Sequence, residues 1–211
     1  MIRVLLVDDH EVVRTGFRLL LQSHGEVSVA GEASSGESAC RIHLELEPDV
    51  TVMDLAMPGM GGLEAIKRIR AHHPGARLLA LSAHDDVMHA RRALREGALG
   101  FLSKRSAPEA LLEAVITVAA GRRYIDMGLA QKLALEDLEG TGKSPIERLS
   151  EREFEVFMRL ARGETVARIA EDLKLSASTV GTHLYNIKQK LGVSNQSELT
   201  LLALRHGLLQ A

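Results

Sequence analysis

Apolar residues in the first part of the chain form short runs separated by longer amphipathic stretches. The runs have strand length, whereas the stretches between them repeat apolar residues every three or four positions. We predict strands over 2–7, 27–31, 49–54, 78–82 and 100–104, and helices over 12–22, 37–46, 62–72, 86–96 and 108–120. This alternation predicts a flavodoxin-like, doubly wound (βα)5 sheet of the α/β class.

The alternation stops after Gly121, and the remaining patterns are helical. A helix over 127–138, with leucines 129, 133, 135 and 138 on one side, precedes a joint rich in Gly, Ser and Pro. Further helices are predicted to run from a capping box at Ser150–Glu153 to residue 162, and over 166–173, 177–191 and 196–205. A short helix, a tight turn and a longer helix are typical of a helix-turn-helix. We predict a first domain over 1–121, a linker over 122–145 and a small all-α domain over 146–211.

Composition and charge limit the classes of protein. The chain of 211 residues is 45% apolar and 26% charged, which is ordinary for a globular protein. Its one cysteine, Cys40, excludes a disulfide framework, and no leader or membrane segment is evident, so we expect a cytoplasmic protein with no membrane partner. The net charge of −2 does not indicate nucleic acid, but residues 176–191 contain Lys188 and Lys190 and no acid.

Polar side chains stand where four of the predicted strands end. Asp8 and Asp9 follow the first strand, Asp54 ends the third, and Ser82 and Lys104 end the next two. Carboxyl ends of parallel strands meet at one edge of a sheet. We therefore expect three carboxylates, a hydroxyl and an ammonium in one crevice.

Three crowded carboxylates repel one another, and Mg²⁺ relieves that repulsion through oxygen ligands. We expect Asp9, Asp54 and the backbone carbonyl of Ala56 to bind the ion, with Asp8 acting through a water molecule. The free oxygen of Asp54 can then attack phosphorus and form an aspartyl phosphate. The hydroxyl and the ammonium would hold the phosphoryl oxygens.

A single Asp at a strand end is explained by capping of the next helix, but the complete set is not. The motifs VDDHE at 7–11, MDLAMPGMGG at 53–62, LSA at 81–83 and GALGFLSK at 97–104 resemble the receiver domain of bacterial two-component response regulators. The resemblance implies that a histidine kinase donates a phosphoryl group to Asp54 and that Ser82 and Phe101 act as switch residues. Two departures are that Phe101 lacks a tyrosine hydroxyl and that Ala56 is too small to shield the phosphoryl group.

The predicted helix over 177–191 has an apolar and a polar face. Its apolar stripe is Val180, Leu184, Ile187 and Leu191. The candidate DNA contacts are Ser178, Thr179, Thr182, His183, Tyr185, Asn186 and Gln189, with Lys188 and Lys190 beside them. Hydroxyls and amides suit base edges, and lysines suit phosphates.

The motifs LSERE at 149–153, IAEDL at 169–173, LSASTV at 175–180 and KLGV at 190–193 resemble the LuxR-type DNA-binding domain of the NarL/FixJ family. The resemblance implies binding to double-stranded DNA at an inverted repeat. It also implies a homodimer in the active state, paired through Leu199 and Leu202 of the last helix. Gly181 is a departure, because relatives often have a lysine there that reaches DNA.

These patterns favour a response regulator that has no enzymatic turnover beyond its own phosphorylation and dephosphorylation. One alternative is a DNA-binding regulator that works without phosphorylation, its crevice being a relic or the site of another ligand. A phosphoaspartyl phosphatase would need a second Asp where Ala56 stands, and a tail that binds protein would show little dependence on salt. We expect His10 only to pack beside the acid pair, because no His pair has metal-ligand spacing.

Overall fold

The computed structural model describes residues 1–23, 25–83, 87–106, 108–138, 145–206 and 208–209. The chain divides into two compact units, residues 1–139 and residues 140–211. Among the described residues, no helix is both long and apolar enough to cross a membrane.

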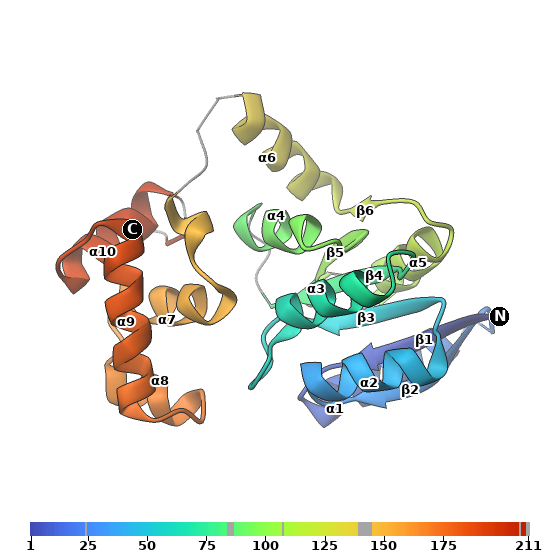
Figure 1. Ribbon diagram of the computed structural model, residues 1–211. Coiled ribbons are helices and arrows are strands. Elements are labelled where there is room, and N and C mark those ends of the chain that lie inside the picture. The colour runs from blue at the N-terminus through green and yellow to red at the C-terminus, as the bar shows by residue number, and fades with distance from the viewer. Residues whose placement is uncertain (24, 84–86, 107, 139–144, 207, 210–211) are drawn as a thin grey trace. The chain divides into compact units, whose positions relative to one another are not determined.

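The first unit is built on a parallel sheet with the strand order β2-β1-β3-β4-β5-β6 (Figure 1). The strands are β1 Ile2–Val7, β2 Val27–Ala33, β3 Val50–Asp54, β4 Leu78–Ser82, β5 Gly100–Ser103 and β6 Tyr124–Ile125. The chain steps from β1 to β2 on one side and returns past β1 to β3 on the other. The predicted doubly wound α/β fold is confirmed, with its topological switch point between β1 and β3.

Helices cover both faces of this sheet. They are α1 Glu11–Gln22, α2 Gly36–Leu46, α3 Gly62–His72, α4 Val87–Arg95, α5 Pro108–Ala119 and α6 Met127–Leu138. Because side chains alternate along a strand, Val4 and Leu6 pack with residues of α1 and α5, while Leu5 and Val7 pack with residues of α2, α3, α4 and α6. One apolar layer therefore packs on each face of the sheet, and together the two layers fix the positions of the strand ends.

The sixth strand is absent from the sequence-based prediction, which has five. Tyr124–Ile125 pairs with β5 through a bond from the Tyr124 amide to the Leu99 carbonyl of 3.2 Å. Two residues are too few to show a periodic pattern, so the pairing emerges only in the folded sheet. Helix α6 follows, and buried Leu129 anchors it to the first unit. The prediction that Leu135 shares this face was wrong: its side chain is 59% exposed, because six residues turn a helix by about 240° from Leu129.

A buried histidine makes the stability of the first unit dependent on pH. The Nδ1 atom of His43 lies 2.9 Å from the Thr51 hydroxyl, and its ring packs edge-on to His73 with centroids 5.5 Å apart. Burial lowers the pKa of His43 from its ordinary 6.5, and His73 adds to the effect. The unfolded chain thus binds this proton more tightly, so the His43 contribution to stability is complete above pH 6.5 and is lost as the pH falls below it.

We therefore expect the free energy of unfolding to fall between pH 7.5 and 5.5, with a shallower fall in His43→Gln. Urea unfolding at several pH values, followed by circular dichroism, measures both slopes. His72→Gln is the matched control, because His72 is exposed. Equal slopes in the wild type and His43→Gln would contradict the assignment.

The second unit is helical throughout its described residues. A 3-10 turn at Pro145–Arg148 precedes α7 Glu151–Ala161, α8 Val166–Asp172, α9 Ala177–Leu191 and α10 Gln196–Arg205. The predicted capping box is confirmed: the Ser150 hydroxyl accepts from the Glu153 amide at 3.3 Å, and the Glu153 carboxylate accepts from the Ser150 amide at 2.7 Å. The core includes Ile146, Phe154, Phe157, Leu160, Ile169, Val180, Ile187, Leu199 and Ala203. This arrangement puts α8 and α9 in helix-turn-helix order.

Candidate functional site

The carboxyl edge of the sheet brings the predicted strand-end residues together. Strand register pairs Asp54 with Leu81 and Ser82 with Ser103, and the amide of Lys104 donates to the carbonyl of Ser82 at 2.7 Å. Asp54 is 1% exposed, and Asp8 and Ser82 are buried to a similar degree. We call the cluster of Asp8, Asp9, Asp54 and Lys104 the acidic site.

Lys104 joins two of the buried carboxylates. Its Nζ lies 2.5 Å from Asp8 Oδ2 and 2.8 Å from Asp54 Oδ2. Burial works to lower the pKa of Lys104, but its ion pairs with Asp54 and Asp8 raise it overall, so the ammonium stays charged. Burial also raises the pKa of the Asp54 carboxyl, which Lys104 opposes. Lys104 thus stabilises the negative charge of carboxylates that would otherwise repel one another.

One ammonium does not balance three carboxylates, and two oxygens show what is missing. Asp9 Oδ1 and Asp54 Oδ2 are both buried atoms: His10 Nδ1 lies 3.1 Å from the first, and Lys104 Nζ lies 2.8 Å from the second. Asp54 Oδ1 accepts a bond of 3.2 Å from the amide of Ala56. Oxygens of this kind are the ligands that Mg²⁺ takes, so the residues present fit a divalent cation.

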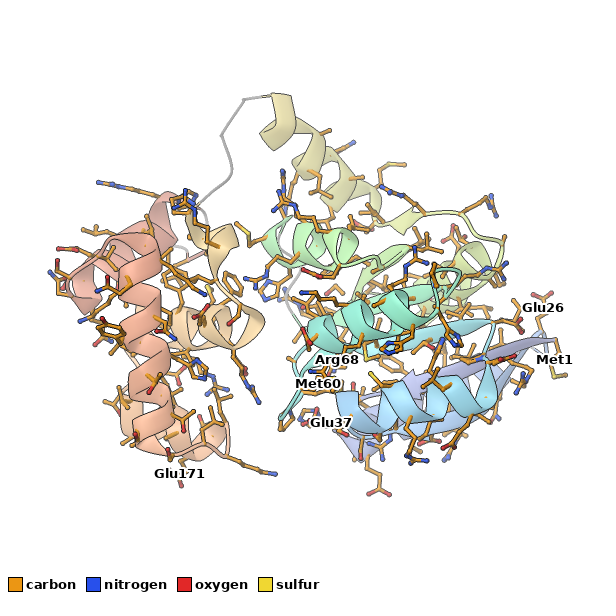
Figure 2. All side chains as sticks on the ribbon, in the orientation of Figure 1. Met1, Glu26, Glu37, Met60, Arg68 and Glu171 are labelled. Carbon is orange, nitrogen blue, oxygen red and sulfur yellow. The ribbon has the colours of Figure 1, made fainter. Side chains whose placement is uncertain are left out.

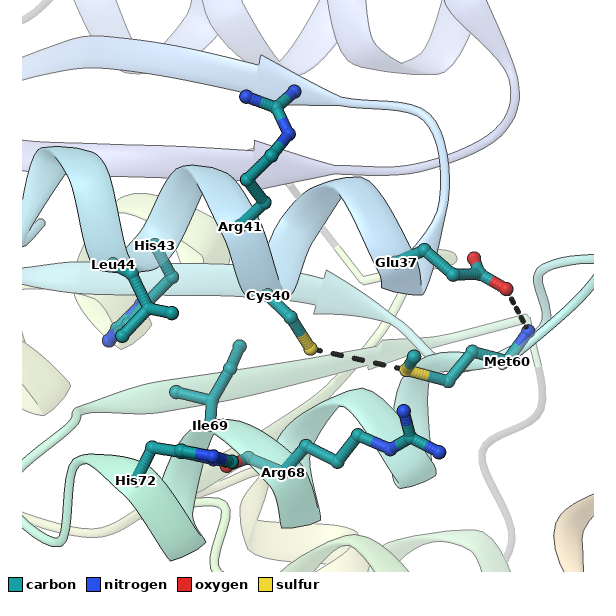
Figure 3. Close-up of a pocket in the computed structure, with 9 residues that line it drawn as sticks. All are labelled: Glu37, Cys40, Arg41, His43, Leu44, Met60, Arg68, Ile69 and His72. Carbon is teal, nitrogen blue, oxygen red and sulfur yellow. Dashed lines mark hydrogen bonds between the residues drawn. The ribbon is translucent and has the colours of Figure 1, made fainter.

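The loop after Asp54 is fastened to helix α2. The Glu37 carboxylate accepts from the Met60 amide at 2.9 Å, and Met60 Sδ lies 4.0 Å from Cys40 Sγ (Figure 3). Glu37, Met60 and Arg68 gather at the same end of α2 and α3 in Figure 2. A cavity of about 420 Å³ beside them is lined mainly by apolar surface of these two helices. These contacts hold the loop that follows Asp54 against helix α2.

Two residues beside the acidic site were missed as candidate site residues. His10 Nδ1 lies 3.1 Å from Asp9 Oδ1 and 3.3 Å from Asp8 Oδ1, and Arg14 Nη1 donates to the Asp8 carbonyl at 2.6 Å. Only their position in the sequence could have identified them, because both follow Asp9 within five residues.

Phe101 lies inside the first unit. Its ring is fully buried among residues that pack against α2, α3, α4 and α6. Ser82 stands one strand away, at the end of β4. The two predicted switch residues are thus in place on neighbouring strands, and their switching stays a prediction.

Helix α9 presents most of the candidate DNA contacts at its surface. Tyr185 is 64% exposed. Ser178, Thr179, Thr182 and Gln189 are exposed as well, whereas His183, Asn186 and Lys188 are half-buried. Buried Val180 and Ile187 hold the opposite face, as the apolar stripe predicts. The helix therefore offers hydroxyl, amide and phenol groups along one side.

Lys190 has a different environment from the one expected for a phosphate contact. Its Nζ lies 2.5 Å from the carboxylate of buried Glu153, which also accepts from the Ser150 amide. Burial tends to raise the pKa of Glu153, but the bonds from Lys190 and Ser150 lower it overall. Lys190 thus fastens the end of α9 to the start of α7, and Lys188 is the lysine of this pair left for phosphate.

We expect Lys190→Met to lower the free energy of unfolding of the second unit by about 1 kcal/mol, because it takes the ion pair from a buried carboxylate while solvent screens the partly exposed lysine. Lys188→Met should leave stability within about 0.5 kcal/mol and weaken DNA binding instead. Chemical unfolding and DNA titrations of both variants measure the two effects. The opposite assignment of losses would restore Lys190 as the phosphate contact.

The two predicted dimer residues differ in burial in the structure. Leu199 is fully buried within its own unit, so it was wrongly assigned to a surface that meets a second copy. Leu202 is half-buried, and Leu201, at 53% exposed, is the large apolar side chain that α10 presents. Apolar spacing alone cannot tell a buried stripe from an interface, which explains the error.

A parallel α/β domain with an acidic site at its strand ends, followed by a helix-turn-helix domain, defines a response regulator that acts on DNA. The family described as "Response regulator receiver domain" matches residues 4–116, and that described as "Bacterial regulatory proteins, luxR family" matches residues 147–203. The chain belongs to the NarL/FixJ family of two-component response regulators, which control transcription in response to phosphorylation.

Individual response regulators are similar to this protein over the whole length of the chain. Response regulator GacA of Pseudomonas viridiflava is 40% identical, over 100% of this chain and 99% of that protein. Response regulator UvrY of Escherichia coli K12 is 41% identical, over 100% and 97%. Among solved structures, RcsB of Salmonella enterica serovar Typhimurium, bound to promoter DNA with phosphomimetic BeF3−, aligns with a TM-score of 0.65 at 28% identity over 95% of this chain and 97% of that one.

Proposed function

We propose that Asp54 is the phospho-acceptor of this regulator and that a histidine kinase is the donor. The observation that carries the proposal is the environment of Asp54. Its carboxylate is buried at a strand end, Lys104 Nζ lies 2.8 Å from Oδ2, and the Ala56 amide donates to Oδ1 at 3.2 Å. A carboxylate held in this way is set to act as a nucleophile rather than as a helix cap.

In the proposed transfer, an Asp54 oxygen attacks phosphorus as the P–N bond of phosphohistidine breaks, and the departing imidazole nitrogen takes up a proton. Lys104 then meets the negative charge that collects on the phosphoryl oxygens, and the Ser82 hydroxyl donates to one of them. When bound at Asp9, Asp54 and the Ala56 carbonyl, with Asp8 acting through water, Mg²⁺ supplies further charge neutralisation. Ala56 is exposed and small, so its side chain offers no polar group that could shield a phosphoryl group on Asp54.

The second part of the proposal is that phosphorylation increases binding of the α9 face to an inverted repeat in double-stranded DNA, as a homodimer in the cytoplasm. Phosphorylation does this only through a better fit to one of two existing states, in which Ser82 and Phe101 differ. Thr182, Tyr185 and Gln189 would contact base edges, and Lys188 would contact phosphate.

Incubation of the full chain with acetyl phosphate tests the proposal, with and without Mg²⁺. We expect the intact mass to increase by one phosphoryl group only with Mg²⁺, and DNA selected from a random pool to bind more tightly afterwards. Affinity should fall several-fold or more for each doubling of salt if about six phosphates are contacted. A folded protein that stays unmodified but binds DNA would favour the phospho-independent regulator. A modified protein without DNA binding would favour a tail that binds protein.

A further inference from the structure

We propose that His10 is a nitrogen ligand of the divalent cation at the acidic site. Its imidazole would make the site favour ions with an affinity for nitrogen, such as Ni²⁺, over Mg²⁺ more strongly than carboxylates alone do. This inference rests on the proposed cation site and adds a residue to it. The sequence pattern gives His10 no role beyond packing.

The separations between the donor atoms fit one ion. Ligand atoms of Asp8, Asp9, His10 and Asp54 all lie within 4.8 Å of one another. Two ligands about 2.2 Å from a metal are about 3.1 Å apart at a right angle and about 3.6 Å apart at a tetrahedral angle. His10 Nδ1 is 3.1 Å from Asp9 Oδ1 and 3.3 Å from Asp8 Oδ1, so it stands at the spacing of neighbouring ligands.

The backbone explains why the imidazole faces the acids. His10 is the N-cap residue of α1, yet its side chain makes no capping hydrogen bond. Its amide instead donates to Asp8 Oδ1 at 2.8 Å, which turns the residue back toward the end of β1. The side chain is 66% exposed, and the nearby Asp9 Oδ1 is a buried oxygen that faces His10 Nδ1 at 3.1 Å and has no other hydrogen-bond partner in the described chain. A cation at this point would satisfy that oxygen and the Nδ1 lone pair together.

The kinds of ligand atom at the site determine which ions it binds more tightly. Carboxylates and water suit Mg²⁺, which keeps several waters and has little use for imidazole. Imidazole suits Ni²⁺ and other first-row transition ions, whose affinities rise from Mn²⁺ to Ni²⁺. The competing explanation is that His10 is only an ion-pair partner of Asp8 and Asp9. An imidazolium would then oppose every cation to a similar extent.

Pulsed electron paramagnetic resonance of Mn²⁺ bound to the full chain separates the two explanations, because a ligating imidazole produces nitrogen modulation of the Mn²⁺ signal. We expect the modulation in the wild type and in His72→Gln, and its loss in His10→Gln, whose amide can replace the nitrogen with oxygen. Ni²⁺ affinity should fall on the order of tenfold in His10→Gln, while Mg²⁺ affinity, measured by competition with Mn²⁺, should change by less than about threefold.

Mn²⁺ binding without nitrogen modulation in the wild type would overturn the role of His10 and leave the proposed cation site intact. Modulation that persists in His10→Gln would likewise overturn it and place the nitrogen on another histidine. Absence of Mn²⁺ and Mg²⁺ binding in the folded wild type would reject the cation site and this inference together. Equal losses for Mg²⁺ and Ni²⁺ in His10→Gln would assign His10 to the structure of the site rather than to the ion.

Discussion

Asp54→Asn is expected to abolish phosphorylation by acetyl phosphate, with no gain of mass under conditions where the wild type gains one phosphoryl group. Asparagine keeps the size of the side chain and an oxygen for the Ala56 amide, but it removes the charge and the nucleophilic carboxylate oxygen. The loss should be complete because the reacting atom itself is replaced. Intact-mass measurement over a time course with Mg²⁺ gives the result directly.

Asp49→Asn is the matched control for this variant. Asp49 stands just before β3, at the opposite end of the strand from Asp54, and its carboxylate accepts from the Arg3 amide at 2.8 Å. Its substitution should leave the phosphoryl gain at the wild-type level. A gain of mass by Asp54→Asn would place the acceptor on another residue. A loss in both variants, with circular dichroism unchanged, would point to the strand as a whole instead.

Gly62→Ala should cause the second large effect, a fall of about 3 kcal/mol in the free energy of unfolding of the first unit. A Cβ atom on Gly62 would stand 2.0 Å from the Asp54 carbonyl oxygen and 2.7 Å from the Leu55 Cα. Both are backbone atoms of the strand end, and the Gly62 amide is bonded to the Leu55 carbonyl at 3.1 Å. The start of helix α3 would therefore have to move away from the end of β3, and the backbone at Asp54 would lose its packing against this helix.

Gly16→Ala is the control for Gly62→Ala, because it makes the same change in a helix with free space. No heavy atom lies within 4 Å of a Cβ built on Gly16 in α1. Stability should rise there by about 0.5–1 kcal/mol from helix propensity alone. Thermal or urea unfolding of both variants measures the contrast. A similar small change at both positions would show that α3 adjusts to the extra carbon without loss.

Residues at strand ends could be predicted from the sequence because two local rules combine. An apolar run fixes the strand, and parallel pairing fixes which ends meet, so Asp8, Asp54, Ser82 and Lys104 followed without knowledge of any distance. The same logic predicted the apolar stripe through Val180, because a helix repeats on a known period.

Contacts between distant positions could not be predicted in this way. Lys190 contacts Glu153, which is 37 residues away in the sequence, and no local pattern around either residue indicates the other. Leu199 shows the same spacing whether it faces its own core or a partner. His10 lies next to recognised acids, but the direction of its ring depends on the backbone where β1 gives way to α1. Each of these features depends on tertiary geometry rather than on a local pattern.

The short strand β6 has a practical consequence for work on the isolated first domain. Strand β5 pairs with β4 on one side and with β6 on the other, and Leu129 of α6 fills part of the adjoining apolar layer. A fragment cut after residue 121 would uncover the backbone of β5 and the layer beneath Leu129, and bare sheet edges recruit other strands. Self-association of such a fragment would then report the cut itself, so a fragment that retains α6 is the sound reagent for dimerisation assays.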